Sequence, residues 1–183
     1  AQTPGWEKEI IIVDDCSRDG TRDILKGYES RMKVIYQEKN GGKGTAVKRG
    51  LSEATGEYAL IQDADLEYNP AEIKDLLGPV NNGSADVVYG SRNLHHVKRN
   101  GFFISRFGVW LITKLINVFY RLKLTDVWTC YKLFPREAGS DFTGGHFESE
   151  LLFTAALARR SYRFTEVAIS HNPRSIEEGK KIR

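Results

Sequence analysis

The chain has 183 residues, of which 40% are hydrophobic and 28% are charged, and its formal net charge is +3. This length suits a single domain, residues 1–183, and the mild positive charge gives no argument for a nucleic-acid partner. No apolar run reaches the roughly 18 residues of a membrane-spanning helix, so the chain is not expected to cross a membrane, although it can lie on one. Cys16 and Cys130 are expected to be reduced core residues of a cytoplasmic protein.

Strand-like and helix-like segments alternate along the chain. Strands are expected at 9–15, 32–38, 58–62 and 85–92. Helices are expected over about 21–30, after the glycine-rich loop 40–44, from Pro70 onward and over 104–121. This rhythm predicts an α/β protein with a mostly parallel sheet flanked by helices. In such sheets ligands bind beyond the carboxyl ends of the strands, so the polar residues that follow three of these strands are expected to share one edge.

The segment LIQDADLEYNP, residues 60–70, ends a buried strand in three carboxylates. Asp63, Asp65 and Glu67 alternate along the chain, and side chains two positions apart share a face of a strand. Like charges so close together repel each other unless a positive charge lies among them. Carboxylates suit Mg²⁺ or Mn²⁺, and Mg²⁺ is usually completed by substrate phosphates. The pattern therefore predicts a metal site, with a solvated turn of surface acids as the alternative.

Two further features point to a nucleotide. Asp14 and Asp15 close the first strand, where a carboxylate can accept hydrogen bonds from a nucleobase or ribose, although surface acids that cap a turn are the alternative. The loop NGGKG at 40–44 lacks the GxxxxGK[ST] spacing of a phosphate loop, which excludes an ATPase of that type. Its glycines still let the backbone approach a ligand, so Lys43 is a candidate for a nucleotide contact. A plain tight turn explains the loop nearly as well.

The segment from Val87 to Thr125 contains no Asp or Glu. Within it, residues 101–123 are predicted to form a basic amphipathic helix. Its apolar face would carry Ile104, Phe107, Leu111, Leu115 and Phe119. Its polar face would carry Arg106, Thr113, Lys114, Asn117 and Arg121. Such a helix suits an anionic membrane surface or a lipid acceptor. The alternative is that the apolar face covers the sheet.

Together the motifs VDDCSRDGT, NGGKGTAV, QDADLEYNP and ADVVYGSR resemble family 2 glycosyltransferases with the GT-A fold. Downstream, TDVWTCYKLFPRE, FESELL and EVAISHNPRSIEEGKK resemble the branch that contains dolichyl-phosphate mannose and glucose synthases and bacterial polyprenyl-phosphate relatives. The resemblance runs from Glu9 to the end of the chain. Against the family pattern the chain starts at the second strand. We therefore expect a GT-A domain that lacks the family's first strand and the Pro-Tyr-Asn-Glu-like turn after it.

The resemblance implies roles for the acidic residues. Asp63 and Asp65 match the motif that binds the metal and the diphosphate, and Glu67 stands where this branch usually has a glutamine ligand. Asp15, with Asp14 beside it, matches the acid that meets the nucleotide base.

The resemblance also implies roles on the acceptor side. Arg92, which follows Ser91, and Arg106 resemble the arginines that receive the acceptor phosphate. Asp126 belongs to a motif that lies beneath the sugar pocket. The basic residues that match a loop closing over the donor diphosphate are Arg174, Lys180 and Lys181. Asp65, Asp126 and Arg174 are the residues expected to carry catalysis.

The implied reaction is an inverting, metal-dependent transfer of a hexose to a polyprenyl or dolichyl phosphate. The donor would be a nucleotide-sugar of the GDP-mannose or UDP-glucose type, and the enzyme would lie at the cytoplasmic face of a membrane. A phosphate acceptor is already ionised at neutral pH, so it needs arginines rather than a general base. A sugar hydroxyl would need a base, for which Asp126, Glu148 and Glu150 are candidates. The alternatives are a same-fold enzyme acting on a glycan or protein hydroxyl, and a non-catalytic nucleotide-binding module.

Overall fold

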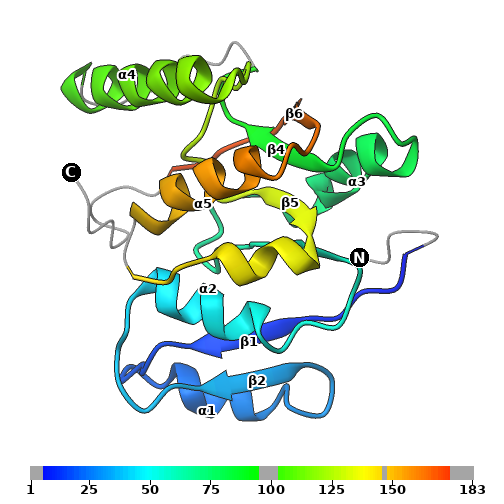
Figure 1. The fold of residues 1–183 in the computed structure, drawn as a ribbon. Coiled ribbons are helices and arrows are strands. Elements are labelled where there is room, and N and C mark those ends of the chain that lie inside the picture. Colours follow the sequence, from blue (N-terminus) through cyan, green and yellow to red (C-terminus); the bar gives the residue numbers. More distant parts are fainter. Residues whose placement is uncertain (1–5, 95–102, 146–147, 174–183) are drawn as a thin grey trace. The chain divides into compact units, whose positions relative to one another are not determined.

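A computed structural model describes residues 6–94, 103–145 and 148–173, with side chains between 94 and 108 left out. The described chain is an α/β structure with two compact parts, as Figure 1 shows element by element. The first part comprises Ala1–Ala59 and Phe134–Leu157, and the second comprises Leu60–Leu133 and Ala158–Arg183. The α/β class predicted from the sequence is confirmed, whereas the organisation of residues 1–183 as a single domain stays a prediction.

The first part is built on two parallel strands, β1 (Ile11–Asp14) and β2 (Lys33–Tyr36). Each strand is followed by a helix, α1 (Thr21–Lys26) after β1 and α2 (Lys43–Leu51) after β2. The β-branched residues that open β1 suit a pleated, half-buried surface. The later elements of this part are the 3₁₀ segment η2 (Arg136–Asp141) and the helix α5 (Glu148–Arg159), which extends past Leu157.

Three phenylalanines form a packed cluster in the first part. The Phe153 ring lies 4.7 Å from the Phe134 ring and 5.0 Å from the Phe142 ring, measured between centroids. All three side chains are buried. Tilted and edge-on aromatic pairs of this kind add to the stabilisation that burial alone provides.

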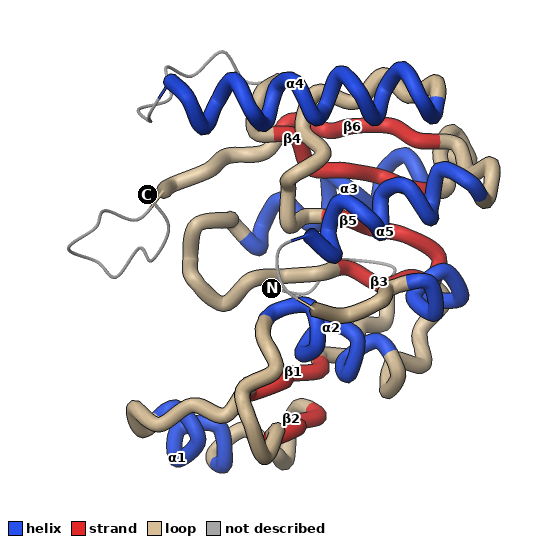
Figure 2. Tube along the Cα trace, turned by 60° about the vertical axis from the view of Figure 1, so that its left-hand side comes forward, coloured by secondary structure: helices blue, strands red, loops and turns tan. Residues whose placement is uncertain are grey.

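The second part is organised around β4 (Val87–Ser91), whose residues are all buried. This strand pairs in parallel with β6 (Phe164–Ala168) and antiparallel with β5 (Lys132–Pro135). The whole four-stranded sheet has the order β3-β5-β4-β6, with β3 at Tyr58–Leu60. The helical elements of the second part are η1 (Pro70–Glu72), α3 (Ile73–Asn81) and α4 (Phe103–Tyr120). In Figures 1 and 2 alike, α4 lies next to β4 and β6.

The elements expected from the sequence are present, but several are shorter. The first helix ends at Lys26 instead of about residue 30, because Gly27 closes a turn onto the carbonyl of Ile24. Cys16 and Cys130 carry thiols and are half-buried, so their assignment as core residues was wrong. Within the described ranges, no helix combines the length and apolar content that a membrane crossing requires.

Candidate functional site

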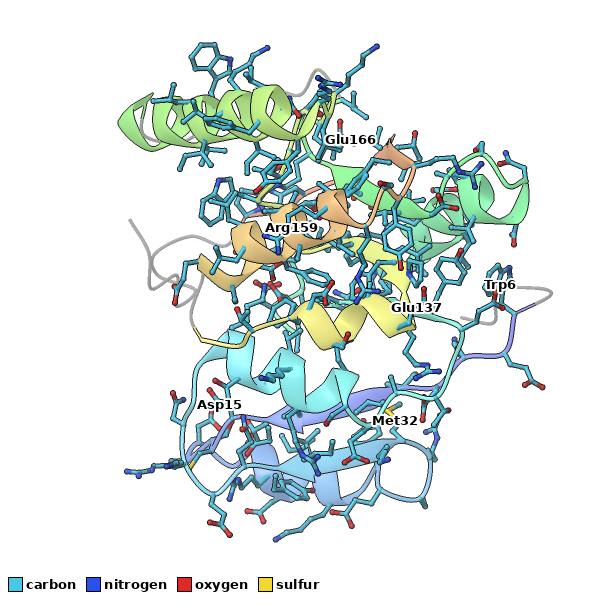
Figure 3. The ribbon with its side chains drawn as sticks, in the orientation of Figure 1. Trp6, Asp15, Met32, Glu137, Arg159 and Glu166 are labelled. Atoms are coloured by element: carbon cyan, nitrogen blue, oxygen red, sulfur yellow. The ribbon has the colours of Figure 1, made fainter. Side chains whose placement is uncertain are left out.

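Asp15 follows β1 and closes the glycine-rich loop of the first part (Figure 3). Its two carboxylate oxygens accept hydrogen bonds from the backbone N–H groups of Gly41 and Gly42, at 2.7 and 2.8 Å. The side-chain amide of Gln37 donates to the same carboxylate at 2.8 Å. A negative charge before the first turn of α2 is favourable because the helix N-terminus is electropositive. Asp15 therefore fixes this loop, and its predicted contact with a nucleotide base stays a prediction.

Asp14 is buried at the end of β1 and is bound by the protein itself. Arg22 Nε donates to its Oδ2 at 2.6 Å, and the backbone N–H of Ser17 donates at 3.2 Å. Burial acts to raise the pKa of Asp14, but the hydrogen bonds from Ser17 and Arg22 outweigh it and hold the pKa below its ordinary value. Asp14 is therefore an ionised anchor for the turn between β1 and α1.

Lys43, a predicted nucleotide contact, begins α2 and pairs with a carboxylate of α5. Its Nζ lies 3.2 Å from Oε1 of Glu150, whose side chain is 5% exposed. The next residue, Gly44, approaches α5 so closely that a Cβ there would lie 2.5 Å from the Gly145 carbonyl oxygen and 2.6 Å from Ser149 Oγ. The glycine thus allows α2 and α5 to pack, a role that the sequence pattern did not reveal. Glu150, a candidate base, is instead a partner of Lys43.

The carboxylates of the acid loop, residues 63–67, lie in the second part and have separate partners. Cys130 Sγ donates to Asp63 Oδ2 at 2.7 Å. Asp65 Oδ1 accepts the backbone N–H of Glu67 at 3.1 Å. Leu66, with φ of 62°, takes a left-handed conformation that interrupts the strand alternation on which the expected convergence depended. Among the described residues, no group of three or more His, Cys, Asp or Glu side chains is placed to hold a metal ion.

Asp63 and Asp65 nevertheless fit a hard cation by their chemistry. Both are half-buried carboxylates in the loop that follows β3. Mg²⁺ is commonly held by one or two carboxylates, with waters and substrate phosphates completing its shell, so a three-residue protein cage is not required. Glu67 instead meets His171, with 3.1 Å between its Oε2 and the ring Nε2. The assignment of all three residues as metal ligands stays a prediction.

Arg92 and Asp126 form a buried two-pronged ion pair in the second part. Arg92 Nε and Nη2 lie 2.6 and 2.8 Å from the two carboxylate oxygens of Asp126, and the Arg92 backbone N–H also donates to Asp126. The side chains are 16% and 0% exposed. Burial acts to lower the pKa of Arg92, but the hydrogen bond and charge of Asp126 outweigh it and raise the pKa. Asp126 therefore anchors Arg92 and is poorly placed to accept a proton from a substrate.

Glu166 lies on β6 (Figure 3), and its side chain holds the chain segment that carries Asp126. Its carboxylate accepts hydrogen bonds from the backbone N–H groups of Thr125 and Asp126, at 2.8 and 3.0 Å. Burial raises the pKa of Glu166 above its ordinary value, although these hydrogen bonds oppose the rise. The Thr125 hydroxyl also shares a 2.6 Å hydrogen bond with Ser91, which is fully buried. Ser91, a predicted acceptor-phosphate contact, thus belongs to the buried support of Arg92.

Tyr68 and Cys130, for which the sequence predicted no role in a site, contact each other, and Cys130 also contacts the acid loop. The Tyr68 hydroxyl accepts the backbone N–H of Cys130 at 3.5 Å, and its ring lies 4.9 Å from the ring of Tyr131. Burial raises the pKa of Tyr68, and the positive charge of Arg92 acts in the opposite direction. The only sequence signal was the position of Tyr68 and Cys130 inside motifs shared with the family.

Asn172, two residues before Arg174, is hydrogen-bonded to the acid loop. The backbone N–H of Asn172 donates to the carbonyl oxygen of Glu67 at 2.9 Å. The three basic residues predicted to close over a diphosphate, Arg174, Lys180 and Lys181, lie outside the described residues, as does the side chain of Arg106. The structure therefore leaves these four assignments as predictions.

Comparison with solved structures defines the class of fold. Glucosyl-3-phosphoglycerate synthase from Mycobacterium tuberculosis superposes with a TM-score of 0.65 at 20% sequence identity, over 93% of this chain and 63% of that one. This similarity confirms the predicted GT-A class of fold.

A family model then identifies the chain. The model described as glycosyl transferase family 2 matches residues 1–142, and the chain belongs to this family. The family prediction made from the motifs is therefore confirmed.

Curated relatives match the chain to different extents. An uncharacterized protein of Methanocaldococcus jannaschii is 26% identical over 88% of this chain and 76% of its own length. The low-salt glycan biosynthesis hexosyltransferase Agl6 of Haloferax volcanii is 28% identical over 91% of this chain and 41% of its own length. A dolichol-phosphate mannosyltransferase of Pyrococcus furiosus is 40% identical over 48% of this chain. The chain spans only 25% of that protein and 30% of another relative, a putative teichuronic acid biosynthesis glycosyltransferase of Bacillus subtilis.

Proposed function

We propose that this chain is the catalytic domain of a hexosyltransferase that transfers a hexose from a nucleotide-sugar to a polyprenyl phosphate. The observation that carries the proposal is that the acid loop and the buried guanidinium of Arg92 lie in the same compact part of the protein. There the Cys130 thiol donates to Asp63 and the Cys130 backbone N–H donates to Tyr68, whose pKa the charge of Arg92 acts to lower. A carboxylate that suits a divalent cation and a guanidinium in the same part of the protein fit a reaction with phosphate groups on both the donor and the acceptor.

The names of the relatives support each part of this proposal. Agl6 is described as a hexosyltransferase, and the Pyrococcus furiosus relative as a dolichol-phosphate mannosyltransferase. The Mycobacterium tuberculosis synthase was solved in complex with Mn²⁺ and UDP-glucose. These descriptions favour a hexose, a lipid phosphate and a divalent cation respectively.

In the proposed reaction a phosphate oxygen of the acceptor attacks the anomeric carbon. The bond between that carbon and the donor diphosphate breaks, and the nucleoside diphosphate leaves with the electron pair, which inverts the anomeric centre. Asp63 and Asp65 would hold Mg²⁺ or Mn²⁺, which supplies positive charge for the leaving diphosphate. Arg92 and Arg106 would bind the acceptor phosphate, with Arg174, Lys180 and Lys181 on the donor side. Asp14, Asp15 and Lys43 would support the nucleotide.

The structure gives less support to an acceptor hydroxyl. Two candidate bases, Asp126 and Glu150, are buried and paired with Arg92 and Lys43. A carboxylate held by a cation is a weaker proton acceptor, because the positive charge favours its ionised form. Because a polyprenyl acceptor resides in a bilayer, we also propose that the protein works peripherally at the cytoplasmic face of a membrane.

The test begins with calorimetric binding of GDP and UDP, each with and without Mn²⁺. We expect one nucleotide to bind the chain only with Mn²⁺, and Asp65→Ala to abolish that binding. The matched control is Asp75→Ala, which removes an exposed carboxylate of α3 and should leave binding unchanged. Nucleotide binding that does not depend on Mn²⁺ or on Asp65 would refute the proposed metal site.

Turnover then separates the proposed acceptor from the alternatives. The chain is incubated with the nucleotide-sugar of the bound base, Mn²⁺ and a short-chain polyprenyl phosphate, and the lipid-linked sugar is measured. Formation of that product supports the proposal. Turnover only on a glycan or protein acceptor would replace it with the hydroxyl-acceptor alternative. Nucleotide binding without turnover on any acceptor would indicate a non-catalytic module.

A further inference from the structure

The helix α4 presents a row of large apolar side chains to solvent. The exposed fractions are 53% for Trp110, 42% for Leu111, 47% for Leu115, 75% for Val118 and 76% for Phe119. Single exposed hydrophobic residues need no explanation, but several on one helix indicate an interaction site. We call these five residues the outer face of α4.

The opposite side of α4 faces its own part of the protein. Thr113 is buried, and its hydroxyl donates to the carbonyl oxygen of Val109, one turn earlier in the same helix, at 2.8 Å. The Asn117 amide donates to the Leu124 carbonyl at 2.7 Å and accepts the Leu124 N–H at 2.9 Å. In a helix of 3.6 residues per turn, positions 113 and 117 lie away from 111, 115 and 118. Thr113 and Asn117 therefore mark the side of α4 that faces the protein, while much of its apolar surface faces outward.

The sequence left open whether the apolar face of this helix covers the sheet, and the orientation of α4 differs from that expectation. An apolar helix face commonly covers a sheet, because burial removes it from water. Here Leu111, Leu115 and Phe119, three of the residues expected on the apolar face, are exposed instead. The described part of α4 therefore leaves most of that face available to a partner.

The charge around the outer face narrows the choice of partner. Lys114, Arg121 and Lys123 are exposed, and the chain has no Asp or Glu between Val87 and Thr125. A second copy packed on this face would bring like charges together with no acid in the segment to offset them. An anionic lipid surface complements the same charges, with each basic residue near the surface adding about a fivefold gain in binding. Tryptophan among them suits the boundary between headgroups and acyl chains.

We propose that the outer face of α4 seats the protein on an anionic lipid bilayer. The helix lies in the plane of the interface, its apolar side chains enter the acyl boundary, and Lys114 and Arg121 contact the anionic headgroups. This extends the proposed function by assigning the surface that would bring the enzyme to a lipid acceptor. The binding itself needs neither donor nor acceptor, so it is tested separately from the transfer reaction.

The first experiment measures sedimentation of the full chain with vesicles, either of phosphatidylcholine alone or mixed with phosphatidylserine. Wild type should sediment with the mixed vesicles and only weakly with the neutral ones. The double variant Val118→Ser/Phe119→Ser should reduce partitioning by at least about tenfold, since each side chain contributes several buried CH₂ equivalents. Both residues are about three-quarters exposed, so the fold should tolerate the change. The matched control is Ile24→Ser, a 67% exposed residue of α1, which should partition like wild type.

A second pair of variants tests the charges. Lys114→Gln/Arg121→Gln should lower partitioning onto the anionic vesicles by roughly tenfold or more at low salt, and the difference should shrink as salt is added. The matched control, Arg31→Gln/Lys74→Gln, removes two exposed basic residues elsewhere and should bind nearly as wild type does.

Three outcomes would overturn the proposal. The first is a wild-type chain that stays in the supernatant with anionic vesicles, and the second is partitioning that the Val118/Phe119 variant leaves unchanged. The third is self-association in analytical ultracentrifugation that this variant abolishes, which would assign the face to a second copy. Vesicle binding that persists while nucleotide binding fails would count against the transfer reaction and not against this surface.

Discussion

Replacing Asp126 by asparagine should strongly destabilise the protein. The substitution keeps the volume of the side chain but removes its charge, so the guanidinium of Arg92 stays buried without a counter-ion. Breaking a buried ion pair in this way typically costs about 3–5 kcal/mol. Arg92 retains 16% exposure and can recruit some water, so we expect a loss near 3 kcal/mol, at the low end of that range.

Urea denaturation of four proteins measures this pair: wild type, Asp126→Asn, Arg92→Met and the double variant. The coupling free energy of the cycle should reach about 2 kcal/mol, because the double variant no longer buries an unpaired charge. The control is Asp86→Asn, which breaks the pair with Arg163. That pair also has short contacts, but its side chains are 58% and 29% exposed, and exposed pairs contribute only about 0–1 kcal/mol. A loss at Asp126 no larger than the loss at Asp86 would refute the reasoning.

Three smaller predictions concern packing, pH and a helix end. Gly44→Ala should cost about 1–3 kcal/mol by overpacking. At Gly108 the new Cβ would meet no described atom within 4 Å outside its chain neighbours and the backbone of its own helix, so Gly108→Ala should be neutral or stabilising in urea denaturation. Equal losses would contradict this. The pKa of Asp14 is lowered from 3.8, so its stabilisation is present above that pH and lost below it. The difference in unfolding free energy between wild type and Asp14→Asn should therefore shrink as the pH falls below 3.8, and a constant difference would contradict it. Asn117→Ala leaves the N–H and C=O of the buried Leu124 without their side-chain partner, at a cost of about 1–3 kcal/mol. Amide exchange at Leu124 should accelerate, and unchanged exchange would argue against the contact.

Local patterns were enough to locate the secondary structure. The strand expected at 85–92 is β4 at Val87–Ser91, and the helix expected at 104–121 is α4 at Phe103–Tyr120. These signals are local, because β-branched runs and the period of 3.6 reflect the backbone conformation of neighbouring residues. Family membership was also readable, since it depends on the order of short motifs rather than on their contacts.

Contacts between distant residues were not readable in the same way. Asp126 lies 34 positions from Arg92, and nothing in either motif states that they pair. Asp15 was expected to face a nucleotide, yet its carboxylate closes the loop at Gly41 and Gly42. Each of these partners depends on how strands and loops are placed in three dimensions, which a pattern of residue types does not specify.

The sequence by itself thus determined the α/β class and the family, and it showed which acidic and basic residues the proposed chemistry would use. Only the tertiary structure decided which charges pair with each other and which face of α4 is exposed to solvent. A periodic helix has an apolar face whatever its surroundings, but the hydrogen bonds of Asn117 to Leu124 help to fix the side that faces the protein. The partner of a helix face or of a charged side chain is set by packing between residues far apart in the chain. Local sequence patterns do not report such contacts, which become visible only in the folded structure.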